Sequence, residues 1–106
     1  MAGFKLTPAA FQDFEDIARY TRRRWGNAQC DLYLRALDRR FAALAVKPSL
    51  GRPRDDVREG YRGAKEGRHL IFFREAKGGI EIVRILHESM DVESRLQKAQ
   101  DSADET

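Results

Sequence analysis

Residues 68–87 read RHLIFFREAKGGIEIVRILH, and this stretch decides the fold. Its two halves, 68–75 and 80–87, are rich in Ile, Val and Phe, a composition typical of β-strands. Between them, the run Lys77-Gly78-Gly79 has the glycines that a tight hairpin turn requires. The stretch therefore predicts two antiparallel neighbouring strands of one sheet.

Both of these strands are apolar on both faces. Phe72 and Phe73 must point to opposite sides of the sheet, and so must Ile85 and Leu86. Because helices can cover only one of the two faces, we expect the other face to be exposed, with Arg84 at its rim. An exposed apolar face that is rimmed by arginine predicts a binding partner.

Two helices precede the strands. Thr7-Pro8 is typical of a helix start, with Thr as the N-cap and Pro in the first turn. The pair Gly26-Asn27 is expected to end this helix, and a second helix is expected from near Ala28 until Pro48 stops it. The second helix carries one apolar stripe at spacings of four and three: Cys30, Leu34, Leu37, Phe41 and Leu44.

Weaker strand patterns lie at residues 3–7 and 61–65, so the expected element order is β-α-α-β-β-β. The apolar stripe of a helical hairpin must be buried, and a sheet is the available surface. The predicted fold class is therefore α+β, with an N-terminal helical hairpin packed on a small antiparallel sheet. We expect residues 1–96 to form a single domain and residues 97–106 to be a disordered polar tail.

The composition bounds the possible functions. The 106 residues include 20 Lys and Arg against 17 Asp and Glu, a formal net charge of +3. This balance favours an acidic partner, although a simple solvated face is the alternative. No apolar run approaches the ~18 residues of a membrane span, and we expect no signal peptide at the start of the chain. The single Cys30 fits a reducing compartment, so the chain is expected to be cytoplasmic without membrane contact.

Neither a metal nor a cofactor is expected. One cysteine and two histidines at this spacing match no zinc motif. The glycines form neither a phosphate-binding loop nor a dinucleotide-binding fingerprint.

The two histidines stand at the start and the end of the strand pair. A three-residue turn would pair residue 76 with 80 and place His69 opposite His87, whereas pairing residue 77 with 80 would place His69 opposite Glu88. A histidine pair beside Arg68 could move a proton during RNA cleavage. The alternative interpretation is two half-buried histidines at strand ends.

Several strings spread over residues 4–96 are recognisable in combination. They are LTPAAFQDFEDIARYT, RRWGNAQCDLYLRAL, FAALAVKPSLGRPRDDVREGYR, GRHLIFFR and IEIVRILHESMD. With these strings the chain resembles the ParE branch of the RelE/ParE toxin superfamily. The resemblance implies the toxin half of a bacterial type II toxin–antitoxin pair, with a helical hairpin on a small sheet.

The resemblance also implies a target and a partner. The expected target is DNA gyrase, whose inhibition blocks replication, and the expected partner is a ParD-like antitoxin with an acidic, flexible C-terminal region. The toxin would form a hetero-oligomer with the antitoxin and contact DNA only through that complex. The residues expected to bind the target are Arg84, His87, Met90, Asp91 and Arg95. Those expected to bind the antitoxin are Arg58, Arg68, Phe72 and Leu86.

Two other functions remain open from the sequence. A RelE-like ribosome-dependent mRNA endonuclease would use Arg68, His69 and His87 as catalytic residues. Against it, Glu88 stands near where a second basic group is expected, and no tyrosine follows Tyr61. These departures favour a protein inhibitor of a topoisomerase over an enzyme. The second alternative is a non-toxic relative that binds the antitoxin and helps to repress their operon.

Overall fold

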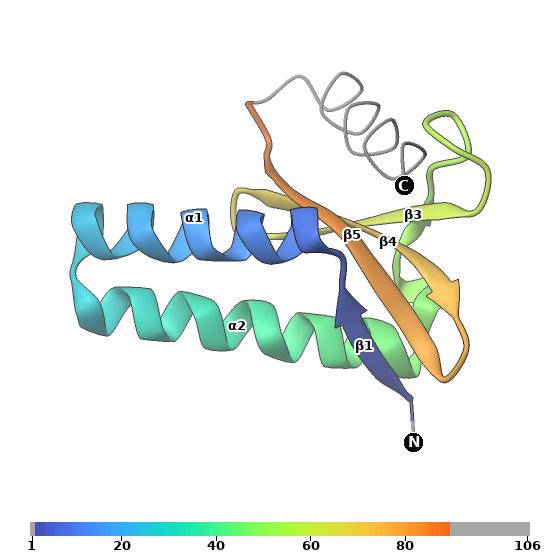
Figure 1. Cartoon of the computed structure of the whole chain (residues 1–106), viewed down its shortest axis with the longest axis horizontal. Helices are drawn as coiled ribbons and strands as arrows, with labels where there is room; N and C mark the ends of the chain where they lie inside the picture. The colour runs from blue at the N-terminus through green and yellow to red at the C-terminus, as the bar shows by residue number, and fades with distance from the viewer. Residues whose placement is uncertain (1, 90–106) are drawn as a thin grey trace.

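A computed structural model of the chain describes residues 2–89 (Figure 1). Its elements are β1 (Gly3–Leu6), α1 (Pro8–Trp25), α2 (Asn27–Val46), the 3-10 turn η1 (Pro48–Leu50), β2 (Arg52–Pro53), β3 (Tyr61–Glu66), β4 (His69–Ala76) and β5 (Gly79–His87). The expected polar tail and the target-binding candidates Met90, Asp91 and Arg95 lie outside the described residues. Neither described helix is long and apolar enough to cross a membrane.

The two helices form the expected antiparallel hairpin (Figure 1). Thr7 is the N-cap of α1, and its hydroxyl oxygen accepts a hydrogen bond from the Ala10 amide at 3.0 Å. The break between the helices is shorter than predicted, because Gly26 alone separates them and α2 begins at Asn27. Gly26 has φ +91°, a backbone conformation that glycine adopts without strain, so one residue is enough to reverse the chain.

The sheet has five strands in the order β1-β5-β4-β3-β2. The α+β class is confirmed, but the expectation of a wholly antiparallel sheet is wrong, because β1 runs parallel to β5. Thr7 explains the arrangement: its amide donates to the carbonyl of Ile82 at 3.0 Å and its hydroxyl donates to that of Val83 at 2.9 Å. The residue that starts α1 thus also fixes β1 beside β5.

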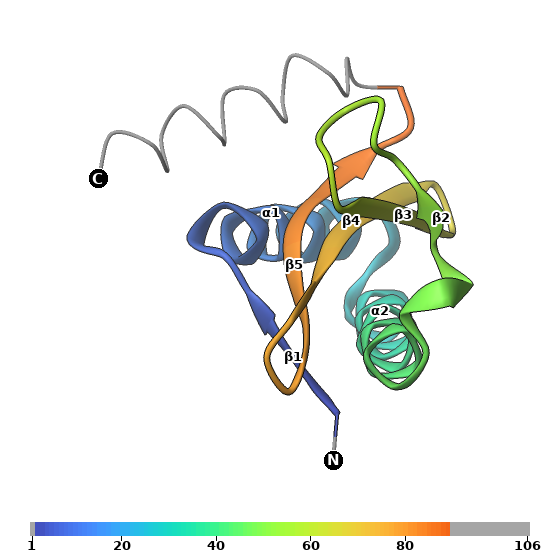
Figure 2. The ribbon, with the colours of Figure 1, turned by 90° about the vertical axis from the view of Figure 1, so that its right-hand side faces the viewer.

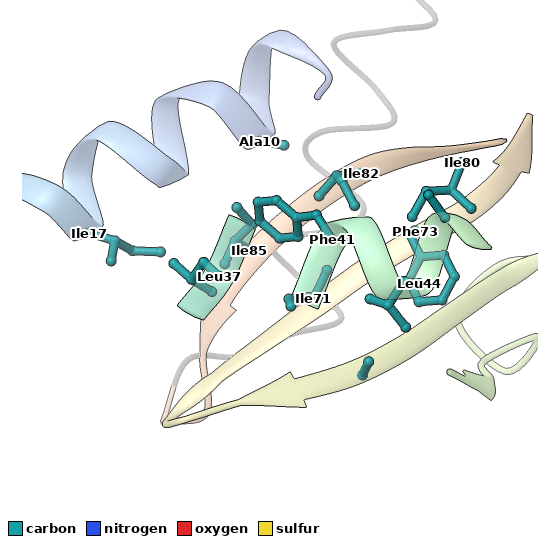
Figure 3. Close-up of a cluster of buried hydrophobic side chains, with 12 residues drawn as sticks. Ala10, Ile17, Leu37, Phe41, Leu44, Ile71, Phe73, Ile80, Ile82 and Ile85 are labelled. Atoms are coloured by element: carbon teal, nitrogen blue, oxygen red, sulfur yellow. The ribbon is translucent and has the colours of Figure 1, made fainter. Parts of the chain in front are cut away.

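The main core lies between the helical hairpin and one face of the sheet (Figure 3). Leu37, Phe41 and Leu44 from the α2 stripe are at most 1% exposed. They pack with sheet residues such as Ile71 and Ile82, each fully buried. Burying side chains of this size contributes roughly 1.5–3 kcal/mol each, so the stripe is confirmed as core.

A second apolar cluster lies on the other face of the sheet. It consists of Tyr61, Phe72, Val83 and Leu86, with Val57 and Leu70 packed against it. Phe72 is 0% exposed and Leu86 1% exposed, so the expectation that they line an exposed face is wrong. The segment between β2 and β3 lies across this face, on the side away from α2 (Figure 2), and supplies Val57. Its Arg54 guanidinium lies over the Phe72 ring, 5.5 Å from the centroid.

Candidate functional site

The register of β4 and β5 places His69 opposite His87. The turn has two residues, the shorter of the two lengths considered from the sequence, but Ala76 pairs with Gly79 instead of residue 77 with 80. That turn alone would set His69 opposite Leu86, but a β-bulge inserts Val83 between the pairs Phe73–Ile82 and Phe72–Arg84 and shifts the register by one residue. The two imidazole rings meet edge to face with centroids 5.4 Å apart.

His69 is held by a tyrosine that the sequence analysis did not single out. The Tyr33 hydroxyl, on α2, donates to the Glu66 carbonyl at 3.0 Å and also lies within hydrogen-bond distance of His69 Nδ1. When the hydroxyl proton is directed to Glu66, a neutral His69 that carries its proton on Nδ1 donates to the tyrosine oxygen. The spacing of α2 could not reveal this contact, since Tyr33 and His69 are 36 residues apart in the chain.

The surroundings keep both members of this pair uncharged. Burial, and to a smaller extent the charge of nearby His87, lowers the pKa of His69 to about 4. Burial also raises the pKa of Tyr33 to about 12, with the charge of Glu66 acting in the same direction. His69 is therefore a neutral imidazole near pH 7.

Gly67 allows the close approach of Tyr33. It lies in the two-residue turn between β3 and β4 and has φ +57°. A Cβ atom there would lie 2.8 Å from the Tyr33 hydroxyl oxygen, closer than real Cβ contacts permit. Gly67, the first residue of the string GRHLIFFR, is therefore needed for the close approach of Tyr33.

Glu88 follows β5 directly, at a position where a RelE-like endonuclease is expected to carry a second basic group. A carboxylate oxygen of Glu88 is 3.0 Å from Lys65 Nζ, and the other is 3.5 Å from Arg68 Nη1. The hydrogen bond from Lys65 lowers the pKa of the Glu88 carboxyl, so the group is ionised. His87 Nδ1 lies 2.7 Å from the Ser89 hydroxyl and accepts the Ser89 amide at 3.1 Å.

The histidines form the floor of a cleft between the helical hairpin and the end of the sheet. Six of its lining residues define what we call the histidine cleft: Tyr20, Arg24, Trp25, Tyr33, His69 and His87. Tyr20 and Trp25 are 64% and 62% exposed, and neither was identified from the sequence as a site residue. Both residues lie in the last turns of α1, which extend past the sheet and so leave these side chains exposed (Figure 1).

Arg84 is not at the rim of an exposed face, and this expectation is wrong. Its guanidinium binds the Asp13 carboxylate of α1 through two nitrogens, at 2.7 and 2.9 Å. The side chains are 14% and 11% exposed, and Asp13 also accepts the Ile85 amide at 3.0 Å. The pair joins α1 to β5 in the interior, so Arg84 has a structural role.

The chain shows clear relatives. The family model "ParE toxin of type II toxin-antitoxin system, parDE" matches residues 4–92. The chain belongs to the ParE toxin family. Toxin ParE1 of Mycobacterium tuberculosis is 40% identical over 94 residues, which cover 88% of this chain and 96% of that protein. Toxin ParE1 of Caulobacter vibrioides is 35% identical over 96 residues, covering 91% and 99%.

Two further comparisons agree with the family. Toxin ParE of Escherichia coli is 35% identical over 97 residues, covering 91% of this chain and 94% of that protein. A chain in the solved structure of the chromosomal ParDE toxin–antitoxin system from P. aeruginosa aligns with a TM-score of 0.68 at 20% identity, covering 82% and 96%. At this identity the structural match shows the fold, which is that of a ParE toxin.

This ParE-family chain has a second hollow, lined by β2, β3 and β4 residues together with Arg40 of α2. Its volume is about 450 Å³, and we call it the basic groove. The residues that define it are the cationic Arg40, Arg52, Arg54 and Lys65 and the apolar Leu50, Leu70 and Phe72. The Arg40 Nε atom is buried without a hydrogen-bond partner among the described residues. An acidic segment with apolar residues fits such a groove.

The residues expected to bind an antitoxin do not gather at one place. Phe72 lies in the floor of the basic groove, and Arg58 is exposed in the segment before β3, outside the groove lining. Arg68 lies in the β3–β4 turn at the histidine cleft, and Leu86 is buried. Their roles in binding stay predictions.

The neutral state of His69 predicts a pH dependence of stability. Its pKa is about 4 in the folded chain, below the ordinary 6.5. Between these values the unfolded chain takes up a proton that the folded chain does not, so stability is lost as the pH falls from about 6.5 to 4. Urea unfolding at pH 7 and pH 5 measures this loss.

His69→Asn is the matched variant, because the Asn amide can still donate to Tyr33 without gaining a proton. We expect its stability to fall less than that of the natural chain between pH 7 and pH 5. His87→Asn serves as the control and should keep the natural decline. An equal decline in the natural chain and in His69→Asn would contradict the role of His69.

Proposed function

We propose that this ParE-family toxin inhibits DNA gyrase by binding to it, and that a ParD-like antitoxin neutralises it. The observation that carries the choice of binding over cleavage is the contact of Glu88 with both Lys65 and Arg68. Cleavage of a phosphodiester requires cations that stabilise the added negative charge. Here the Glu88 carboxylate already pairs with two cations, Lys65 and Arg68.

The state of His69 supports the same choice. A general base works best when its pKa is near the working pH, and the pKa of His69 is about 4. Its Nδ1 is also engaged by Tyr33. The RelE-like endonuclease alternative therefore has weaker support than the inhibitor. In the proposed mechanism the toxin makes and breaks no covalent bond.

We place the antitoxin in the basic groove. Arg40 and Arg52 can pair with the acidic residues of a flexible segment, and Arg54 and Lys65 can do so in exchange for Asp56 and Glu88. Leu50 and Leu70 accept the apolar side chains of the segment. Arg40 supports this placement, because its buried and unpartnered Nε gains an acceptor when a carboxylate enters. Arg54 already lies over the Phe72 ring and presents its guanidinium to the groove.

The test is the supercoiling of relaxed plasmid by purified gyrase. We expect the toxin to reduce supercoiling or to increase linear cleaved plasmid, and the antitoxin to reverse the effect. Folded toxin that leaves supercoiling unchanged while cleaving mRNA on ribosomes would overturn the proposal in favour of the endonuclease. Folded toxin that does neither, and is harmless when expressed alone, would favour the antitoxin-binding co-repressor.

The groove assignment predicts a separation of the two activities. The double variant Arg52→Ala with Arg54→Ala should inhibit gyrase as the natural chain does, but bind the antitoxin about 100-fold more weakly or worse, because two charge-assisted contacts of roughly 1.5–3 kcal/mol each are lost. Titration calorimetry measures the affinity.

Arg74→Ala is the control for this variant. Arg74 is also a strand arginine, but it pairs with Glu81 at 2.6 Å and lies outside the groove lining. If the double variant binds the antitoxin as tightly as Arg74→Ala does, the antitoxin does not use the basic groove.

A further inference from the structure

The hairpin end of the histidine cleft exposes two large aromatic rings. Trp25 and Tyr20 are 62% and 64% exposed and line the cleft together with the half-buried ring of Tyr33. Trp25 and Tyr20 belong to neither apolar cluster, whereas Tyr33 packs against the main core with part of its ring. Exposed aromatic side chains grouped around a hollow mark a binding site rather than a packing surface.

The charge of the cleft is positive. Arg24 and Arg68 are among the residues that line it, and since Arg68 already contacts Glu88, Arg24 supplies the charge that is open to a ligand. The Arg24 guanidinium lies over the Trp25 ring, 5.2 Å from the centroid. Arg24 is not ion-paired with a carboxylate within residues 2–89, so its N–H groups are available to an incoming anion.

From this arrangement we infer that the histidine cleft binds a nucleotide of a single-stranded nucleic acid, with the base against Trp25 and Tyr20 and the phosphate on Arg24. Aromatic rings next to arginine are the recurring elements of single-strand binding, because every base has a π-face and every nucleotide a negative charge. The cleft volume of about 780 Å³ is within the roughly 300–1,000 Å³ of small-molecule sites.

A single strand fits better than a duplex or an acidic peptide. In a duplex the base faces are stacked on each other and cannot reach Trp25 or Tyr20. An acidic peptide has no π-faces for these rings, and the basic groove offers it more cations. The strand is bound and not cleaved, since Glu88 lies at Arg68 and His69 is a weak base.

This inference departs from the expectation that the toxin contacts DNA only through the antitoxin complex. It does not depend on gyrase as the target, because it concerns binding to the free toxin. The two proposals can therefore fail separately.

Trp25 makes the inference directly testable, because it is the single tryptophan of the chain. The probes are oligoadenylates of about eight nucleotides, as DNA and as RNA, which match the site sizes of single-strand binders. We expect saturable quenching of Trp25 fluorescence by one or both, weakened by added salt because phosphate contacts release counterions. The two probes distinguish DNA from RNA as the ligand.

Matched variants locate the site. Tyr20→Ala should weaken the binding by about 5- to 150-fold, the range for loss of one stacking contact. Phe11→Ala is the control, since Phe11 is 56% exposed on the same helix but does not line the cleft. Arg24→Gln should flatten the salt dependence, whereas Arg19→Gln, at an exposed pair with Asp16, should not.

Four results would overturn the inference. The first is no quenching by either oligonucleotide up to about 1 mM, above the range of non-specific binding. The second is equal quenching by inorganic phosphate, which would mean that only the charge is bound. The third is equal quenching by an acidic peptide, which would make the cleft a protein-binding surface. The fourth is Tyr20→Ala binding as tightly as Phe11→Ala.

Discussion

Replacing Asp13 with alanine is expected to lower the free energy of unfolding by about 3–5 kcal/mol, the usual cost of removing one partner from a buried ion pair. Arg84, which is 14% exposed, would lose both of its hydrogen bonds to the Asp13 carboxylate, and the Ile85 amide would lose its acceptor. Attraction within the pair is strong because little water reaches it, so the loss far exceeds that of a surface pair. Urea unfolding followed by circular dichroism measures the difference.

Asp16→Ala is the matched control for Asp13→Ala. Asp16 is on the same helix and pairs with Arg19 at 3.3 Å, but these side chains are 56% and 59% exposed. Exposed pairs of this kind contribute about 0–1 kcal/mol. Asp13→Asn, which keeps one oxygen acceptor, should fall between the two. If Asp13→Ala costs no more than Asp16→Ala, the pair does not hold α1 to the sheet.

The second large effect is expected at Gly79, where β1 meets β5. Gly79 has φ +149°, and a Cβ atom there would lie 1.7 Å from the Gly3 carbonyl oxygen. Gly79→Ala must therefore displace β1 or distort the β4–β5 turn. Backbone strain of this kind costs about 1–3 kcal/mol, and lost strand contacts add to it, so we expect a total of roughly 3 kcal/mol or more.

Gly3→Ala is the natural control, because Gly3 is the partner of Gly79 in the parallel pair and has nothing within 4 Å of its Cβ position. Thermal unfolding of the two variants compares their stabilities. Hydrogen exchange should also show loss of protection at the Thr7 amide, which bonds to Ile82, in Gly79→Ala only. Equal stability of the two variants would show that β1 and β5 tolerate a side chain at this point.

These two variants test links that join distant segments, and such links were the hardest to predict. The strand pair 68–75 and 80–87, the cap at Thr7 and the stripe on α2 were all predicted correctly, because each depends on residues close in sequence. The pairing of His69 with His87 was one of two alternatives. It is realised through a two-residue turn and a bulge at Val83, and no short-range pattern indicates a bulge at that position.

The candidate site shows the same limit. His69, His87 and Arg68 were identified as polar residues at strand ends, but Tyr33, Tyr20 and Trp25 were not identified as site residues. Their helices lie beside the sheet end only in the folded chain, where 36 residues separate Tyr33 from His69. The exposed arginine expected at position 84 is instead buried against Asp13, because α1 crosses β5 there.

The sequence by itself determined the α+β class, the helical hairpin, the hairpin of strands and the resemblance to ParE toxins. These follow from periodicity, caps, turns and local strings, which are read along the chain. Only the tertiary structure decided that β1 runs parallel to β5, that Phe72 and Leu86 are covered, and that aromatic rings, arginines and histidines meet in one cleft. The physical reason is that burial and contact depend on which distant surfaces pack together, and packing is a property of the whole chain.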